Sequence, residues 1–91
     1  MIHLKNKVAV ITGCNKGIGQ ETVKIFSENG AKVYACVRKI SDEFKSFIND
    51  IKKKTKNEII PIQLDLGIED TIKKASDEIL SQSAQIDILV N

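Results

Sequence analysis

The chain has 91 residues, of which 42% are hydrophobic and 29% charged, and its formal net charge is +2. This length allows at most one domain, and the hydrophobic content is typical of a folded protein rather than a disordered one. The net charge is too small to indicate a nucleic-acid partner, and no apolar stretch approaches the roughly 18 residues of a membrane span. We therefore expect a soluble, cytoplasmic protein with no nucleic-acid or membrane partner.

The first predicted element is a strand from Lys7 to Thr12. Residues 8–11 form a continuous apolar run, which is typical of a parallel strand covered on both faces. Predicted helices and strands then alternate along the chain without a repeat or a low-complexity linker. This alternation predicts an α/β fold built on a parallel sheet.

A glycine-rich turn follows this strand and reads Thr12-Gly13-Cys14-Asn15-Lys16-Gly17-Ile18-Gly19. A strand that passes at once into a helix needs glycine where φ is positive, and a bound phosphate needs backbone unobstructed by Cβ atoms. N–H groups at the start of the helix would then face a pyrophosphate. The spacing differs from the G-x-G-x-x-G fingerprint and from the phosphate loop. Taken alone, it fits a tight connection as well as a dinucleotide site.

A helix is predicted from about Gly17 to Glu28, followed by a stop at Asn29-Gly30 and a strand over Ala31–Val37. Apolar spacing predicts that one face of this helix is buried. The residues of that face are Ile18, Thr22, Ile25 and Phe26.

The next predicted helix begins after Ser41, whose side chain is suited to cap it, with two carboxylates in the first turn. Its predicted buried stripe consists of Phe44, Phe47, Ile48 and Ile51. Four lysines, at positions 52–54 and 56, lie at its end, where positive charge offsets the exposed carbonyls. A solvated helix end explains them better than a nucleic-acid patch, because only 4% of the residues are aromatic.

The third predicted strand covers Glu58–Asp65 and contains Pro61, which cannot donate to a ladder and therefore favours an edge position. A helix over residues 68–82 follows, with Ile68, Ile72, Ala75 and Ile79 along its buried side. A buried fourth strand is predicted over Ile86–Asn91. A doubly wound sheet of order 3-2-1-4 accommodates these elements with the third strand at its edge.

The two cysteines, Cys14 and Cys36, lack CxxC spacing and a companion histidine cluster. We expect both to be reduced, with neither a disulfide nor a metal site. His3 is interpreted as a solvated residue near the terminus.

The glycine turn resembles the Thr-Gly-x3-Gly-Ile-Gly signature of the short-chain dehydrogenase/reductase family. Two further segments resemble that family in the right order: Leu64-Asp65-Leu66, and Asp87-Ile88-Leu89-Val90-Asn91, which is similar to the start of its Asp-x-Leu-Val-Asn-Asn-Ala-Gly motif. A methyltransferase or an extended epimerase would show other glycine spacings. The resemblance implies a Rossmann-type fold and covers the whole chain. Because the second asparagine is missing, we expect residues 1–91 to be the N-terminal part of a longer domain.

The resemblance also implies how a nicotinamide dinucleotide cofactor is bound. The glycine turn, residues 13–19, would hold the pyrophosphate. Asp65 and Leu66 would contact the adenine, and Asn91 would border the adenosine ribose. Thr12 and Asp87 would help to fix the turn after the fourth strand. The second strand ends in Cys36-Val37-Arg38-Lys39, with no acid to bind the ribose of NAD. Arg38 can bind a 2′-phosphate and Lys16 adds a second cation, which favours NADP over NAD, whereas Lys39 is interpreted as a solvated loop charge.

The family's chemistry needs a tyrosine, a lysine four residues later, and a serine. Tyr34 is the only tyrosine and is followed at that spacing by Arg38, so we interpret it as a packing residue and assign no catalytic residue. The resemblance implies an NADP-dependent oxidoreductase, similar to 3-oxoacyl-acyl-carrier-protein reductases and carbonyl reductases, that acts on a carbonyl or alcohol and is a homo-oligomer when full-length. The alternative is a non-catalytic dinucleotide-binding module, a truncated product or a redox sensor.

Overall fold

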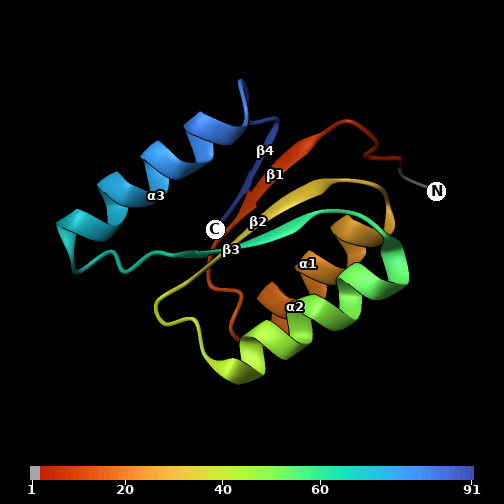
Figure 1. The fold of residues 1–91 in the computed structure, drawn as a ribbon, viewed down its shortest axis with the longest axis horizontal. Coiled ribbons are helices and arrows are strands. Elements are labelled where there is room, and N and C mark those ends of the chain that lie inside the picture. The colour runs from red at the N-terminus through yellow and green to blue at the C-terminus, as the bar shows by residue number, and fades with distance from the viewer. Residues whose placement is uncertain (1–2) are drawn as a thin grey trace.

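The structure is a computed structural model and describes residues 3–91. Its elements in chain order are β1 (Val8–Ile11), α1 (Gly17–Glu28), β2 (Lys32–Val37), α2 (Asp42–Thr55), β3 (Ile59–Gln63), α3 (Glu69–Gln82) and β4 (Ile88–Val90). The strands form one parallel sheet in the order β3-β2-β1-β4 (Figure 1). The predicted α/β fold and its strand order 3-2-1-4 are therefore confirmed.

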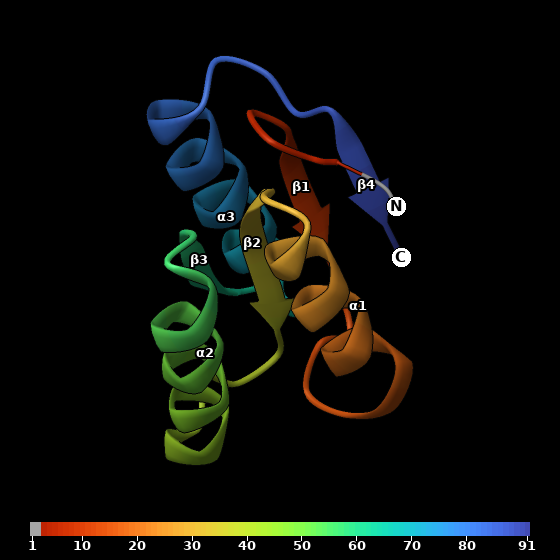
Figure 2. The same ribbon diagram turned by 90° about the vertical axis from the view of Figure 1, so that its right-hand side faces the viewer.

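Helices cover both faces of this sheet, with α1 and α2 on one face and α3 on the other (Figures 1 and 2). Side chains of a strand alternate between the two faces. Val33, Ala35 and Val37 of β2 accordingly pack with α1 and α2, whereas Tyr34 and Cys36 pack with α3. This double cover explains why β1 and β2 are apolar without alternation.

Local signals set the ends of the first two helices as predicted. The Ser41 hydroxyl accepts a hydrogen bond from the Phe44 N–H at 3.1 Å and caps α2. At the end of α1, Gly30 has a φ of +100° and its N–H donates to the Ser27 carbonyl at 3.1 Å. Both the cap and the glycine stop are therefore confirmed.

The predicted face of α1 is correct only in part, because Phe26 is half-buried and packs against the core. The helix buries Val23 and Ser27, while Ile18 is 87% exposed and Ile25 is also exposed. Ser27 can be buried because its hydroxyl is 3.0 Å from the Thr55 hydroxyl of α2. A pattern of apolar residues cannot reveal a face whose contact with its neighbour includes a hydrogen bond.

The stripe of α2 is confirmed, since Phe44, Ile48 and Ile51 are buried and Phe47 is half-buried. The stripe of α3 is confirmed only over its second half. Ala75 and Ile79 are buried, whereas Ile68 and Ile72, at and near its start, are exposed.

Of the two edge strands, β3 lies where it was predicted, whereas β4 differs from its prediction. Pro61 lies in β3, at the predicted edge of the sheet. The fourth strand is shorter than expected and is not buried: β4 pairs only with β1, and Leu89 is 66% exposed. Because β4 is the other edge of this sheet, its outer side has no neighbouring strand among the described residues.

Candidate functional site

A cavity of about 560 Å³ lies beyond the carboxyl ends of β1, β2 and β3. Open parallel sheets bind their ligands at this edge, and the volume lies within the usual range for small-molecule sites. The lining residues come from the end of β2 and from the segments that follow the three strands: Thr12, Gly13, Asn15, Cys36, Val37, Arg38, Leu64, Asp65, Leu66 and Gly67.

The glycine turn borders this cavity, and its backbone has a conformation that residues other than glycine adopt only under strain. Gly13 has a φ of +64° and Gly17 a φ of +61°. Gly19 serves a different purpose, because a Cβ built there would lie 2.8 Å from the Gly13 carbonyl carbon and 2.9 Å from Cys14 Cα. The first turn of α1 can therefore approach Gly13 and Cys14 this closely only with glycine at this position.

The start of α1 keeps its positive dipole end free of protein anions. Its N-cap residue, Lys16, makes no side-chain cap hydrogen bond, and the first turn holds no acidic residue. By contrast, α2 has its Ser41 cap and two carboxylates in its first turn. The first N–H groups of a helix lack intrahelical partners, so this end of α1 is suited to an anionic group.

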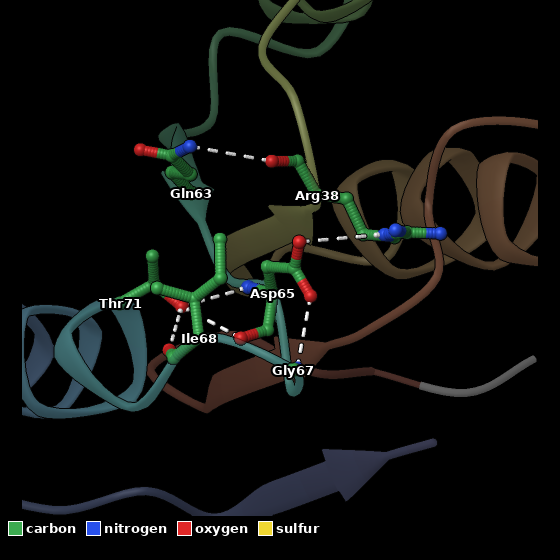
Figure 3. Close-up of polar contacts among 6 residues, drawn as sticks. All are labelled: Arg38, Gln63, Asp65, Gly67, Ile68 and Thr71. Carbon is green, nitrogen blue, oxygen red and sulfur yellow. Dashed lines mark hydrogen bonds and ion pairs between the residues drawn. The ribbon is translucent and has the colours of Figure 1, made fainter.

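Arg38 and Asp65 meet at the mouth of the cavity. Arg38 Nε lies 3.7 Å from Asp65 Oδ2, and the arginine side chain is 83% exposed while that of the aspartate is 20% exposed (Figure 3). Asp65 Oδ1 also accepts a hydrogen bond from the Gly67 N–H at 2.9 Å. The pair places a guanidinium and a carboxylate, each able to recognise part of a nucleotide, on adjacent strand ends.

Both thiols are buried and free. Cys14 Sγ donates to the Ile11 carbonyl at 2.9 Å, and the Cys14 N–H donates to the Cys36 carbonyl at 3.4 Å. Burial raises the pKa of Cys14 to about 12 and that of Cys36 to about 11. Thiols held in the protonated form are poor nucleophiles, which is contrary to a redox-sensor role.

The polar residues around β4 correct one expectation. The Thr12 hydroxyl lies 3.3 Å from the Val90 carbonyl and 3.2 Å from Asn91 Oδ1, as expected for the turn after β4. Asp87 lies at the other end of that strand, where its Oδ2 accepts from the Val8 N–H at 2.8 Å. Asp87 therefore fixes the start of β4, because its side chain is directed to the amino end of the sheet.

The predicted site residues are distributed around the cavity in three groups. Gly13, Asn15, Arg38, Asp65 and Leu66 line it directly. Cys14 lies behind the turn with its thiol directed inward, whereas Lys16 and residues 17–19 form the start of α1 outside the lining. Asn91 lines a neighbouring apolar cavity of about 300 Å³ beneath α3.

Sequence reasoning gave no role to Thr71 and did not predict five of the lining residues as cofactor-binding: Thr12, Cys36, Val37, Leu64 and Gly67. The signal for Val37 was its place at the carboxyl end of a parallel strand. Thr71 follows Asp65 by six residues and joins its turn to α3 through hydrogen bonds at 2.8 and 2.9 Å. A hydroxyl in the first turn of a helix is the signal that could have identified it.

The parallel sheet of order β3-β2-β1-β4, with a cavity at the carboxyl ends of its strands, defines a doubly wound α/β protein. The sequence model of the short chain dehydrogenase family matches residues 7–91. The chain belongs to this short-chain dehydrogenase/reductase family.

Comparison with individual proteins gives the same family. A short-chain dehydrogenase/reductase of Armillaria gallica is 38% identical over 91 residues, which is 100% of this chain and 29% of that protein. Human retinol dehydrogenase 12 is 35% identical over 99% of this chain and 28% of its own length. The chain thus spans less than a third of the curated relatives it matches.

Solved structures agree with the fold. The L-sorbose reductase of Gluconobacter frateurii, complexed with NADPH and L-sorbose, superimposes with a TM-score of 0.87 at 27% identity. The match covers 98% of this chain and 34% of the reductase. A hydroxysteroid dehydrogenase of Escherichia coli has a TM-score of 0.84 at 28% identity, over 98% of this chain and 37% of that one. Within residues 3–91, no helix is both long and apolar enough to cross a membrane.

Proposed function

We propose that this chain is the dinucleotide-binding part of an NADP-dependent oxidoreductase that transfers hydride between NADPH and a carbonyl or alcohol. The observation that carries the proposal is the exposed Arg38 guanidinium at the mouth of the cavity, where β2 ends without an acid. An acid at that strand end favours NAD, whereas a guanidinium can bind a 2′-phosphate bidentately.

The residues present fit such a cofactor. Gly13 and Gly17 hold a turn with positive φ, and the uncapped start of α1 directs N–H groups toward an anion. Asp65 and Leu66 border the same cavity after β3, where we assign them to the adenine. Asn91, next to Thr12, is assigned to the adenosine ribose.

The chemistry that the nicotinamide supplies when bound is hydride transfer; the protein must orient it and exclude water. Tyr34 takes no part, because it is fully buried with its hydroxyl 2.7 Å from the Ser83 hydroxyl. Proton transfer would then depend on residues beyond these 91, and we expect the 91-residue chain alone to be inactive. A 3-oxoacyl thioester or a ketone is the proposed substrate class, and a cytoplasmic homo-oligomer is the proposed state of the longer protein.

The variant Arg38→Asp tests the cofactor assignment. Dissociation constants for NADPH and NADH would be measured by titration calorimetry on the chain and the variant. We expect NADPH affinity to fall by about tenfold or more, because a charge-assisted hydrogen bond is lost and a repulsion is added. NADH affinity should stay the same or improve.

Lys39→Asp is the matched control, because Lys39 is the adjacent exposed cation and does not line the cavity. It should change NADPH affinity far less than Arg38→Asp. Equal effects of the two variants, or an unchanged preference in Arg38→Asp, would sink the assignment of Arg38 to the phosphate.

The alternative function is dinucleotide binding without catalysis. The observation that favours it is the burial of Tyr34, the only tyrosine in these residues. Binding of NADPH without oxidation in the presence of a carbonyl substrate, by a protein extended past Asn91, would support this alternative over the reductase.

A further inference from the structure

We propose that Asp65 and Thr71 are positioning residues that hold the Arg38 guanidinium at the cavity mouth and thereby set the preference of the site for a phosphate-bearing dinucleotide. This inference rests on the proposed function, because it concerns how the same site distinguishes NADPH from NADH. The three residues form a chain of contacts from α3 through the turn after β3 to the end of β2 (Figure 3).

Arg38 needs such support because its side chain is largely in solvent. A long exposed side chain loses rotamer freedom when it binds a ligand, and that loss weakens affinity. Asp65 Oδ2 approaches Nε at 3.7 Å, a distance of an ion pair rather than a hydrogen bond. A contact at Nε leaves the two terminal nitrogens to form a fork with a phosphate.

The carboxylate is itself held in place. Asp65 Oδ1 accepts from the Gly67 N–H at 2.9 Å, which closes a turn around the side chain. The side chain is only 20% exposed. The oxygen that faces Arg38 is therefore carried by a group with little rotational freedom.

Thr71 joins this turn to the first turn of α3. The Asp65 N–H donates to the Thr71 hydroxyl at 2.9 Å, and that hydroxyl lies 2.8 Å from both the Asp65 and the Ile68 carbonyl oxygens. One side chain thus contacts both backbone polar groups of Asp65. Loss of the Thr71 hydroxyl would remove these hydrogen bonds from the turn without removing any charge.

A second contact holds the backbone of Arg38. Gln63 Nε2 donates to the Arg38 carbonyl at 3.4 Å across the ends of β3 and β2. Gln63 thus holds the Arg38 backbone, while Asp65 contacts the guanidinium. The Asp65 carboxylate approaches Nε rather than the terminal nitrogens that would face a phosphate, so we expect positioning to outweigh its repulsion of the phosphate.

The test compares Thr71→Val, which removes the hydroxyl at constant shape, with Thr71→Ser, which keeps it. Calorimetry on the chain and its variants would give the ratio of the NADH to the NADPH dissociation constant. We expect Thr71→Val to lower this ratio about two- to tenfold, the effect of one immobilised side chain, and Thr71→Ser to retain it. In the background of Arg38→Ala, Thr71→Val should leave the ratio unchanged.

Asp65→Asn provides a second variant if Thr71→Val does not fold, as judged by circular dichroism. Its amide oxygen can still accept from Gly67 while the charge that faces Arg38 is gone, so the ratio should again fall. In one outcome the unmodified chain prefers NADPH, while Asp65→Asn, and Thr71→Val where it folds, leave the ratio of the NADH to the NADPH dissociation constant unchanged. That result overturns the positioning role alone. Because Asp65 is also assigned to the adenine, Asp65→Asn should weaken both dinucleotides. Equal weakening of the two, which leaves their ratio constant, overturns the positioning role. A chain without preference for NADPH overturns the proposed cofactor and the positioning role together.

Discussion

The Asp87 carboxylate and the Val8 backbone form a reciprocal pair where β1 and β4 begin. Asp87 Oδ2 accepts from the Val8 N–H at 2.8 Å, and the Asp87 N–H donates to the Val8 carbonyl at 2.9 Å. Gln85 Nε2 donates to the other carboxylate oxygen at 2.6 Å. Because these hydrogen bonds favour the ionised form, the pKa of Asp87 is lowered from its ordinary value of 3.8.

Asp87→Asn should make stability depend less on pH. A folded-state pKa below the unfolded value means that ionised Asp87 stabilises the fold above that unfolded value, and that this contribution is lost as pH falls through the folded pKa. We expect the variant to unfold at lower urea concentration at neutral pH and to approach the unmodified chain in strong acid. A difference that stays constant across the pH series would contradict this role.

Gly19→Ala should destabilise the chain through backbone crowding. The added Cβ would lie within 2.9 Å of Gly13 and Cys14 in the glycine turn, at atoms that belong to the backbone and cannot rotate away. We expect a loss of about 1–3 kcal/mol in the free energy of unfolding, as for other overpacked sites. Urea denaturation measures it, with Lys73→Ala on the exposed side of α3 as the control. Unchanged stability would show that α1 can shift away from β1.

Ser83→Ala should lower the free energy of unfolding more when Tyr34 is present than when it is replaced. The two hydroxyls lie 2.7 Å apart and both residues are buried. Removing one partner leaves the phenol hydroxyl buried without a hydrogen bond, which costs about 1–3 kcal/mol. In the background of Tyr34→Phe, the cost of Ser83→Ala should fall toward zero. If the losses of unfolding free energy in the two single variants add up to that of the double variant in urea denaturation, the hydrogen bond between Tyr34 and Ser83 is contradicted.

Both thiols should resist alkylation in the folded chain. With the pKa of Cys14 raised to about 12 and that of Cys36 to about 11, from an ordinary value of 9.0, the thiolate population falls about 100- to 1000-fold. We expect iodoacetamide to label neither cysteine at neutral pH until urea unfolds the chain. Rapid labelling of Cys14 under native conditions would mean that the glycine turn opens in solution, and would revive a redox role.

Individual residues illustrate how far local chemistry leads. The Ser41 cap, the Gly30 stop and the edge position of Pro61 were predicted correctly, because each depends on the residue itself and its nearest neighbours. Asp87 was assigned to the wrong end of β4, because its partner, Val8, lies 79 residues away. The face of α1 was identified only in part, because a buried Ser27 carries no apolar signal.

The sequence by itself determined the alternation of elements, the strand order, the place of the glycine turn and the family. The first three follow from periodicity over a few residues, from turn chemistry and from the restricted ways in which parallel strands connect. The family followed from the resemblance of the glycine turn and two later segments to its motifs. Only the tertiary structure decided that Arg38 meets Asp65, that Thr71 supports that carboxylate, and that both thiols are buried. Such contacts join residues on different strands and helices, so their geometry depends on how the layers pack and not on any local pattern.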